Sequence, residues 1–111
     1  MDASHKVYLK HIHKLIKRKN VWFLVQRIPD HGYCDINGGL APIVIILDPR
    51  REFIPTLVHE CLHGIYPDYS ERKVHHLERV IMQNITSRQV MSLLRCFCTC
   101  AKLYYAEYEL D

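Results

Sequence analysis

Residues 56–64, Thr-Leu-Val-His-Glu-Cys-Leu-His-Gly, constrain the fold more than any other stretch of the chain. Their apolar side chains recur at the spacing of a helix that buries one side. In such a helix His59 and His63 lie one turn apart on the other side, with about 5–6 Å between their Cβ atoms. Pro55 suits the first turn, where no amide donor is needed, and Gly64 suits the C-terminal end. The pattern therefore predicts a helix over about 55–64 with one apolar side and one side that carries chemistry.

The polar side of this predicted helix has the arrangement His-Glu-x-x-His, in which two imidazoles one turn apart hold a zinc ion. Glu60 falls at the edge of the same face, from where its carboxylate is expected to reach a metal-bound water without being a ligand. Eight histidines in 111 residues make a chance match conceivable, so a helix with two surface histidines is the simpler alternative. The apolar backing of the helix and the acidic residues downstream favour the metal site.

Composition predicts one globular domain over residues 1–111, because 49% of the residues are hydrophobic. The N-terminus lacks the apolar core of a signal peptide, and the longest apolar run is too short to span a bilayer. Five cysteines, an odd number, agree with reduced thiols. We therefore expect a cytoplasmic protein with no membrane partner. A net charge of +3 does not favour nucleic acid as a partner, and the oligomeric state cannot be read from the chain.

Hydrophobic periodicity predicts an α+β fold. A helix over 7–19 carries lysines on its outer face. These predict binding of phosphate or of an acidic partner or, more simply, an ordinary solvated face. Short strands are expected over 21–28, 33–36 and 42–47, with turns at 29–32 and at Asn37-Gly38-Gly39. These form a small, mostly antiparallel three-stranded sheet, packed with about four helices. Further helices start near Asp68 or Ser70 and near Thr86, and the last one continues through Tyr108.

A catalytic zinc needs a third protein ligand and an open position for water. The spacing His-x-x-Gly-x-x-His is ruled out, because Tyr66 and Tyr69 occupy the places of the glycine and the last histidine. The remaining candidates lie on the next helix. A short antiparallel connection favours Glu71, whereas Glu78 lies two turns further on the same face. His75 and Asp68 stay as further alternatives, and a residue that is not a ligand is expected to orient a histidine.

Here the sequence resembles a known group of enzymes. Val58-His59-Glu60-Cys61-Leu62-His63-Gly64, followed by Asp68-x-Ser70-Glu71-x-x-Val74, is similar to the gluzincin zinc metallopeptidases. The small size and the order of elements resemble minigluzincins and the short metallopeptidases of phages and prokaryotes. The resemblance is specific over residues 56–81 and architectural elsewhere. It implies a minimal zincin-like domain in which the His-Glu helix is followed by a glutamate helix.

The resemblance implies a zinc-dependent hydrolase that cleaves peptide bonds of a peptide or protein substrate, active or latent. His59, His63 and Glu71, with Glu78 as the alternative, are then the metal ligands, and Glu60 is the general base. Tyr66, Tyr69 and His75 are candidates for oxyanion stabilisation or for orienting a ligand. The alternative function is a zinc-stabilised binding or regulatory module without catalysis.

The run Cys96-Phe97-Cys98-Thr99-Cys100 is a second candidate for metal binding. On a helix only Cys96 and Cys100 share a face, and a thiolate zinc site usually draws on a second pair of cysteines. We therefore expect these thiols to act as small apolar residues.

Overall fold

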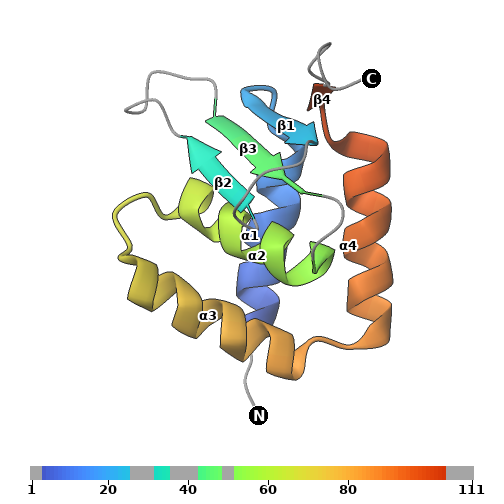
Figure 1. Cartoon of the computed structure of the whole chain (residues 1–111). Coiled ribbons are helices and arrows are strands. Elements are labelled where there is room, and N and C mark those ends of the chain that lie inside the picture. The colour runs from blue at the N-terminus through green and yellow to red at the C-terminus, as the bar shows by residue number, and fades with distance from the viewer. Residues whose placement is uncertain (1–3, 26–31, 36–42, 49–51, 105–111) are drawn as a thin grey trace.

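The computed structural model describes residues 4–25, 32–35, 43–48 and 52–104. Within them the chain forms four helices and a small sheet (Figure 1). The helices are α1 (Ser4–Lys17), α2 (Phe53–Ile65), α3 (Glu71–Asn84) and α4 (Ser87–Cys100). The strands are β1 (Val21–Val25), β2 (Gly32–Asp35), β3 (Ile43–Leu47) and the two-residue β4 (Leu103–Tyr104). The prediction of an α+β class with about four helices agrees with these elements.

The predicted three-stranded, mostly antiparallel sheet is wrong. The strand order is β2-β3-β1-β4. Strand β1 runs parallel to both of its neighbours, β3 and β4, and only the pair β2–β3 in this described sheet is antiparallel. The register joins Val21 with Ile43 and Phe23 with Ile45, which places the buried residues of the two most apolar strands on one face. Short β2 is left at an edge. Turn signals in the sequence indicate where the chain reverses, but burial decides which strands become neighbours.

The core lies on one side of the sheet, where α1 and α2 pack beneath it (Figure 1). Helix α2 is central, because it contacts α1, α3, β2 and β3. Its apolar side is fully buried through Leu57, Val58, Cys61 and Leu62. Fixing α2 in this way leaves its polar side facing α3, so packing determines the direction in which His59 and His63 point.

The helix boundaries follow local capping chemistry. The Ser70 hydroxyl accepts a hydrogen bond from the Lys73 amide at 3.1 Å and starts α3. Thr86 and Gln89 form the predicted capping box at the start of α4. The prediction that the last helix continues past Cys100 through Tyr104 to Tyr108 is wrong. Helix α4 ends at Cys100, and the chain then becomes extended, so that Tyr104 lies in β4. Edge pairing with β1 replaces the last helical turns; residues 105–111 lie outside the described part.

Among the helices that the structure describes, none combines the length and the apolar character that crossing a membrane requires.

Candidate metal centre

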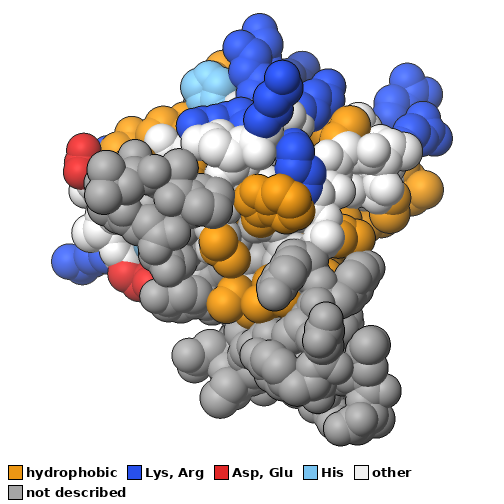
Figure 2. Space-filling model, turned by 90° about the horizontal axis from the view of Figure 1, so that it is seen from above, with side chains coloured by type: hydrophobic (Ala, Val, Ile, Leu, Met, Phe, Trp, Pro, Cys, Tyr) orange, Lys and Arg blue, Asp and Glu red, His pale blue; other side chains and the backbone are white. Residues whose placement is uncertain are grey.

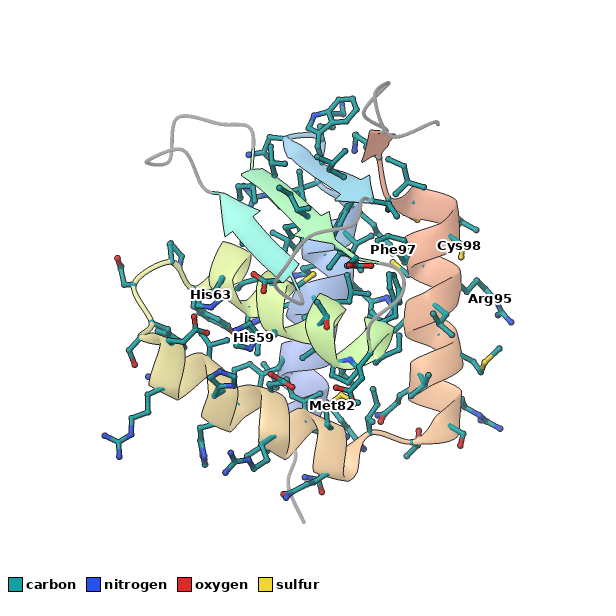
Figure 3. The ribbon with its side chains drawn as sticks, viewed as in Figure 1. His59, His63, Met82, Arg95, Phe97 and Cys98 are labelled. Carbon is teal, nitrogen blue, oxygen red and sulfur yellow. The ribbon has the colours of Figure 1, made fainter. Side chains whose placement is uncertain are left out.

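His59 and His63 lie on the side of α2 that faces α3, as Figure 3 shows. Their ring centroids are 4.9 Å apart, with the planes inclined at 71°. The opposite side of α2 is sealed in the core, so neither ring can turn inward without opening that packing. The predicted helix thus brings the two imidazoles of the motif together on its polar side.

Glu71, the first residue of α3, brings a carboxylate to both histidines. Its Oε1 atom lies 2.6 Å from His59 Nε2 and 3.0 Å from His63 Nε2. Donors bound at about 2.0–2.1 Å around a tetrahedral zinc ion stand roughly 3.3 Å apart. Both contacts, at 2.6 and 3.0 Å, are shorter than this spacing, so a zinc ion bound between them would hold the Glu71 oxygen further from each imidazole nitrogen. The Ser70 cap directly before Glu71 fixes where α3 begins and so holds the carboxylate at the level of His63.

Glu78 contacts the other nitrogen of the same histidine. Its Oε1 atom lies 2.8 Å from His59 Nδ1, so the His59 ring is held between two carboxylates of α3. Glu71 and Glu78 are seven residues apart, two helical turns, and so share one face. A carboxylate that accepts the Nδ1 proton fixes the tautomer in which the Nε2 lone pair is free for a metal. The contact places Glu78 in an orienting position rather than among the converging ligand atoms.

His75 lies between the two glutamates on α3 and is the fifth member of the cluster. Its Nε2 atom is 4.0 Å from Glu71 Oε1, its Nδ1 atom is 3.8 Å from Glu78 Oε1, and its ring centroid is 4.6 Å from that of His59. His59, Glu71 and His75 offer ligand atoms within 4.8 Å of one another. This set contains His75 in place of the predicted ligand His63. His63 Nε2 nevertheless stands closer to Glu71 Oε1, at 3.0 Å, than His75 Nε2 does, at 4.0 Å.

Glu60 is a buried carboxylate beside this cluster. It is 8% exposed, and no hydrogen bond from the described residues reaches it. Burial raises the pKa of Glu60, and the nearby charges of Glu71 and Glu78 add to the rise, while His59 and His63 oppose it. A buried carboxylate without a hydrogen-bond partner is costly and is characteristic of functional sites.

Glu71 has the opposite electrostatic balance. Partial burial is the largest single effect and raises its pKa, but hydrogen bonds from His63 and His59, together with their charges, outweigh it and leave the pKa of Glu71 lowered. The carboxylate is therefore ionised at neutral pH, which is the form that binds a metal.

Tyr66 and Tyr69 form a stack between α1 and α3. Their rings are 4.6 Å apart and nearly parallel, and the Lys73 ammonium lies 3.8 Å above the Tyr69 ring. The Tyr66 hydroxyl is hydrogen-bonded to His11 Nδ1 at 2.7 Å. Burial raises the pKa of Tyr66. No interaction among the described residues joins either tyrosine to His59 or His63, and Asp68 is exposed and takes no part in the cluster.

The sequence named every member of this cluster, but it did not separate their roles. Glu78 was an alternative third ligand, and its contact with the far nitrogen of His59 depends on how α3 lies against α2. The seven-residue spacing to Glu71 was the one available signal. The hydrogen bond between His11 and Tyr66 joins residues 55 positions apart. No pattern of neighbouring residues in the sequence indicates it.

No protein-family model, curated protein or solved structure matches this chain.

Proposed function

We propose that this protein is a zinc-dependent peptidase of the gluzincin type, in which His59, His63 and Glu71 hold the metal and Glu60 is the general base. One observation carries the proposal. Two imidazole nitrogens of the His-Glu-x-x-His helix approach a single carboxylate oxygen of the next helix, at 2.6 and 3.0 Å. Two nitrogens and one carboxylate oxygen are the donor set of hydrolytic zinc sites with a position left for water.

The donor chemistry fits zinc better than a hard cation, because magnesium and calcium prefer oxygen ligands. Zinc in such a site lowers the pKa of a bound water to about 7 and polarises a carbonyl group. Glu60 follows His59 directly and interacts electrostatically with His59, His63 and Glu71. Its carboxylate takes the proton of the attacking water and returns it to the leaving amine.

Glu78 positions the site and does not touch the reacting atoms. Its hydrogen bond with His59 Nδ1 fixes the orientation of that ring, and an anionic partner increases the basicity of the opposite nitrogen. Glu71 and Glu78 therefore divide between them the two roles that the sequence left open. None of the five cysteines, all of which the structure describes, forms a disulfide, which supports a reducing compartment such as the cytoplasm as the place of action.

A second function is favoured by one specific observation, the position of His75. His75 already forms a possible ligand group with His59 and Glu71, and with His63 as well the metal site would be closed by four protein ligands. A closed site stabilises a fold and performs no hydrolysis. The protein would then be a zinc-stabilised binding or regulatory module. The open site is favoured because His75 lies 4.0 Å from Glu71 and 3.8 Å from Glu78, further than His63 lies from Glu71 at 3.0 Å.

The decisive experiment compares the natural protein with Glu60→Gln. Both are purified without added zinc, their bound metal is measured by mass spectrometry, and hydrolysis of an unfolded protein is followed over time. We expect one zinc per chain in both proteins and a loss of activity of about 100-fold or more in the variant, because general-base catalysis contributes about 10²–10⁴-fold.

The outcomes separate the two functions. Zinc in both proteins with no hydrolysis of any unfolded substrate contradicts the peptidase and favours the closed site. Absence of zinc from the natural protein contradicts both. A variant as active as the natural protein removes Glu60 from the mechanism.

A further inference from the structure

A stripe of lysines runs along the outer face of α1. Lys6, Lys10, Lys14 and Lys17 are all exposed and follow one another at helical spacing, on the side of α1 opposite its buried residues. Lysines four residues apart repel each other. Lys6 stands in the first turn, where the helix dipole disfavours a cation and α1 has no acidic residue. No ion pair between described residues neutralises any of these lysines.

The stripe leads to a second group of cations beside β1. Arg18 and Lys19 are exposed at the end of α1. The Lys102 ammonium donates a hydrogen bond to the Arg18 carbonyl at 2.8 Å, and the Lys102 carbonyl accepts one from the Phe23 amide at 2.8 Å. These bonds bring two cations from distant parts of the sequence to the start of β1. The Arg18 Nε atom donates a hydrogen bond to Asn20 Oδ1 at 3.2 Å, which positions its exposed guanidinium at the end of α1.

An exposed aromatic side chain lies between these anchoring bonds. Trp22 is 40% exposed, while its neighbours Val21 and Phe23 are fully buried, so its indole is on the outer face of the sheet. Its partner across the ladder is Val44 of β3, which is also partly exposed. Trp22 therefore presents an aromatic ring to solvent on the strand that the Lys102 backbone joins.

Figure 2 shows this side of the molecule from above, with Lys and Arg side chains gathered along one border and hydrophobic side chains next to them. In the α2–α3 region, by contrast, Asp68, Glu71 and Glu78 are interspersed with the cations Arg72, Lys73 and Arg79. Helix α1 carries its lysines with no acidic residue on the same helix, and this local distribution of charge matters more than the net charge for binding a polyanion.

We propose that this surface binds single-stranded nucleic acid, with a base stacked on Trp22 and the phosphates contacted by Arg18, Lys19, Lys102 and the α1 lysines. Single-strand binding combines a cationic track with an aromatic platform, and every base offers a face for stacking. A duplex keeps its base faces covered. An anionic membrane would be bound by a helix with a free apolar side, but that side of α1 is buried in the core through Leu9, Ile12 and Ile16. The proposal shares no residue with the metal centre and does not rest on the peptidase function.

The test uses Trp22 as its own reporter, because the chain contains a single tryptophan. The full-length protein is titrated with mixed-sequence single strands of about 15 nucleotides, long enough for one binding surface. One arm uses DNA and one uses RNA, which separates the two sources of the same chemistry. Binding is followed by the anisotropy of the labelled strand and by quenching of tryptophan emission.

We expect both signals to saturate together. Simultaneous phosphate contacts from four of the seven proposed cations predict that affinity falls roughly 50-fold between about 50 and 200 mM salt. Trp22→Ala is expected to weaken binding on the order of tenfold, since stacking on an aromatic side chain contributes about that much per base, while Trp22→Phe retains most of the affinity.

A matched pair of variants tests the placement of the charges. Arg18→Glu with Lys19→Glu removes two cations from the proposed surface. Arg88→Glu with Arg95→Glu changes the net charge equally on α4, where Arg95 points away from the rest of the molecule (Figure 3). Circular dichroism checks that each variant is folded. We expect the first pair to lose binding and the second to keep it.

Three results overturn the proposal. One is binding without quenching of Trp22. Another is an equal loss of affinity in both charge-reversal pairs, which indicates non-specific attraction. The third is tighter binding to duplex DNA or to vesicles of anionic lipid than to single strands.

Discussion

Two helices of this protein, α2 and α4, each carry two side chains of metal-binding type four residues apart. The two pairs differ in whether a neighbouring helix brings a further possible ligand to them. His59 and His63 on α2 meet a carboxylate of the next helix. Cys96 and Cys100 on α4 face each other, and the one cluster found among the described residues with three possible ligands lies elsewhere. A pair of ligands at helical spacing becomes a candidate site only where a second element brings a third donor.

The two pairs also differ in what surrounds them. Cys96 is buried among apolar residues of the core cluster, and burial, with the neighbouring Cys100, raises the pKa of its thiol. A thiol binds metal as the thiolate, so this environment works against coordination. Cys98 points outward from the same helix, as Figure 3 shows. The expectation that Cys96 behaves as a small apolar residue agrees with its place in the core.

The largest expected effect is that of removing the third donor. We expect Glu71→Ala to weaken zinc binding by more than about 100-fold, which exceeds the loss caused by mutating an outer partner of a metal ligand. Affinity is measured by competition with a chromophoric chelator. Cys100→Ser is the matched control on α4 and should leave zinc affinity unchanged. A zinc loss in Cys100→Ser, with none in Glu71→Ala, would reverse the comparison between the two helices.

A smaller effect is expected from the carboxylate that orients His59. Glu78→Gln keeps the size of the side chain and a hydrogen-bonding oxygen but removes the charge beside Nδ1. We expect zinc affinity to fall about 10–100-fold, as for other outer partners, with the stoichiometry still one ion per chain. If Glu78→Gln loses zinc completely while Glu71→Ala retains it, the two glutamates have exchanged roles.

The smallest effect is expected at His75. If the site has three protein ligands, His75→Ala should change zinc affinity by less than about tenfold, because its ring contacts the cluster only at 3.8–4.0 Å. The same titration measures it, and cobalt substitution adds a check on coordination through the visible spectrum. A fall as large as that in Glu71→Ala would mean that four protein ligands close the site, and the peptidase proposal would then give way to the structural one.

Much of the local structure could be predicted from the residues themselves. The polar and apolar sides of α2 follow from helical periodicity, and the caps at Ser70 and Thr86 follow from hydroxyl side chains three residues before an amide they can bond. These features depend on neighbours within one or two turns. The same local reasoning carried the last helix too far, because the pairing of Leu103 with Phe23 joins residues 80 positions apart (103 − 23) and competes with helical periodicity.

The sequence by itself therefore determined the helix that presents His59 and His63, the position of Glu60 at the edge of the same face and the short list of partners on the next helix. Tertiary structure alone decided that β1 lies beside β3, that Glu71 meets the Nε2 atoms and that Glu78 meets Nδ1. The physical reason is the distance along the sequence over which each kind of interaction acts. Periodicity and capping act along one helix, whereas the choice between two carboxylates on the same face depends on the angle and offset at which two helices pack, and the whole core fixes these.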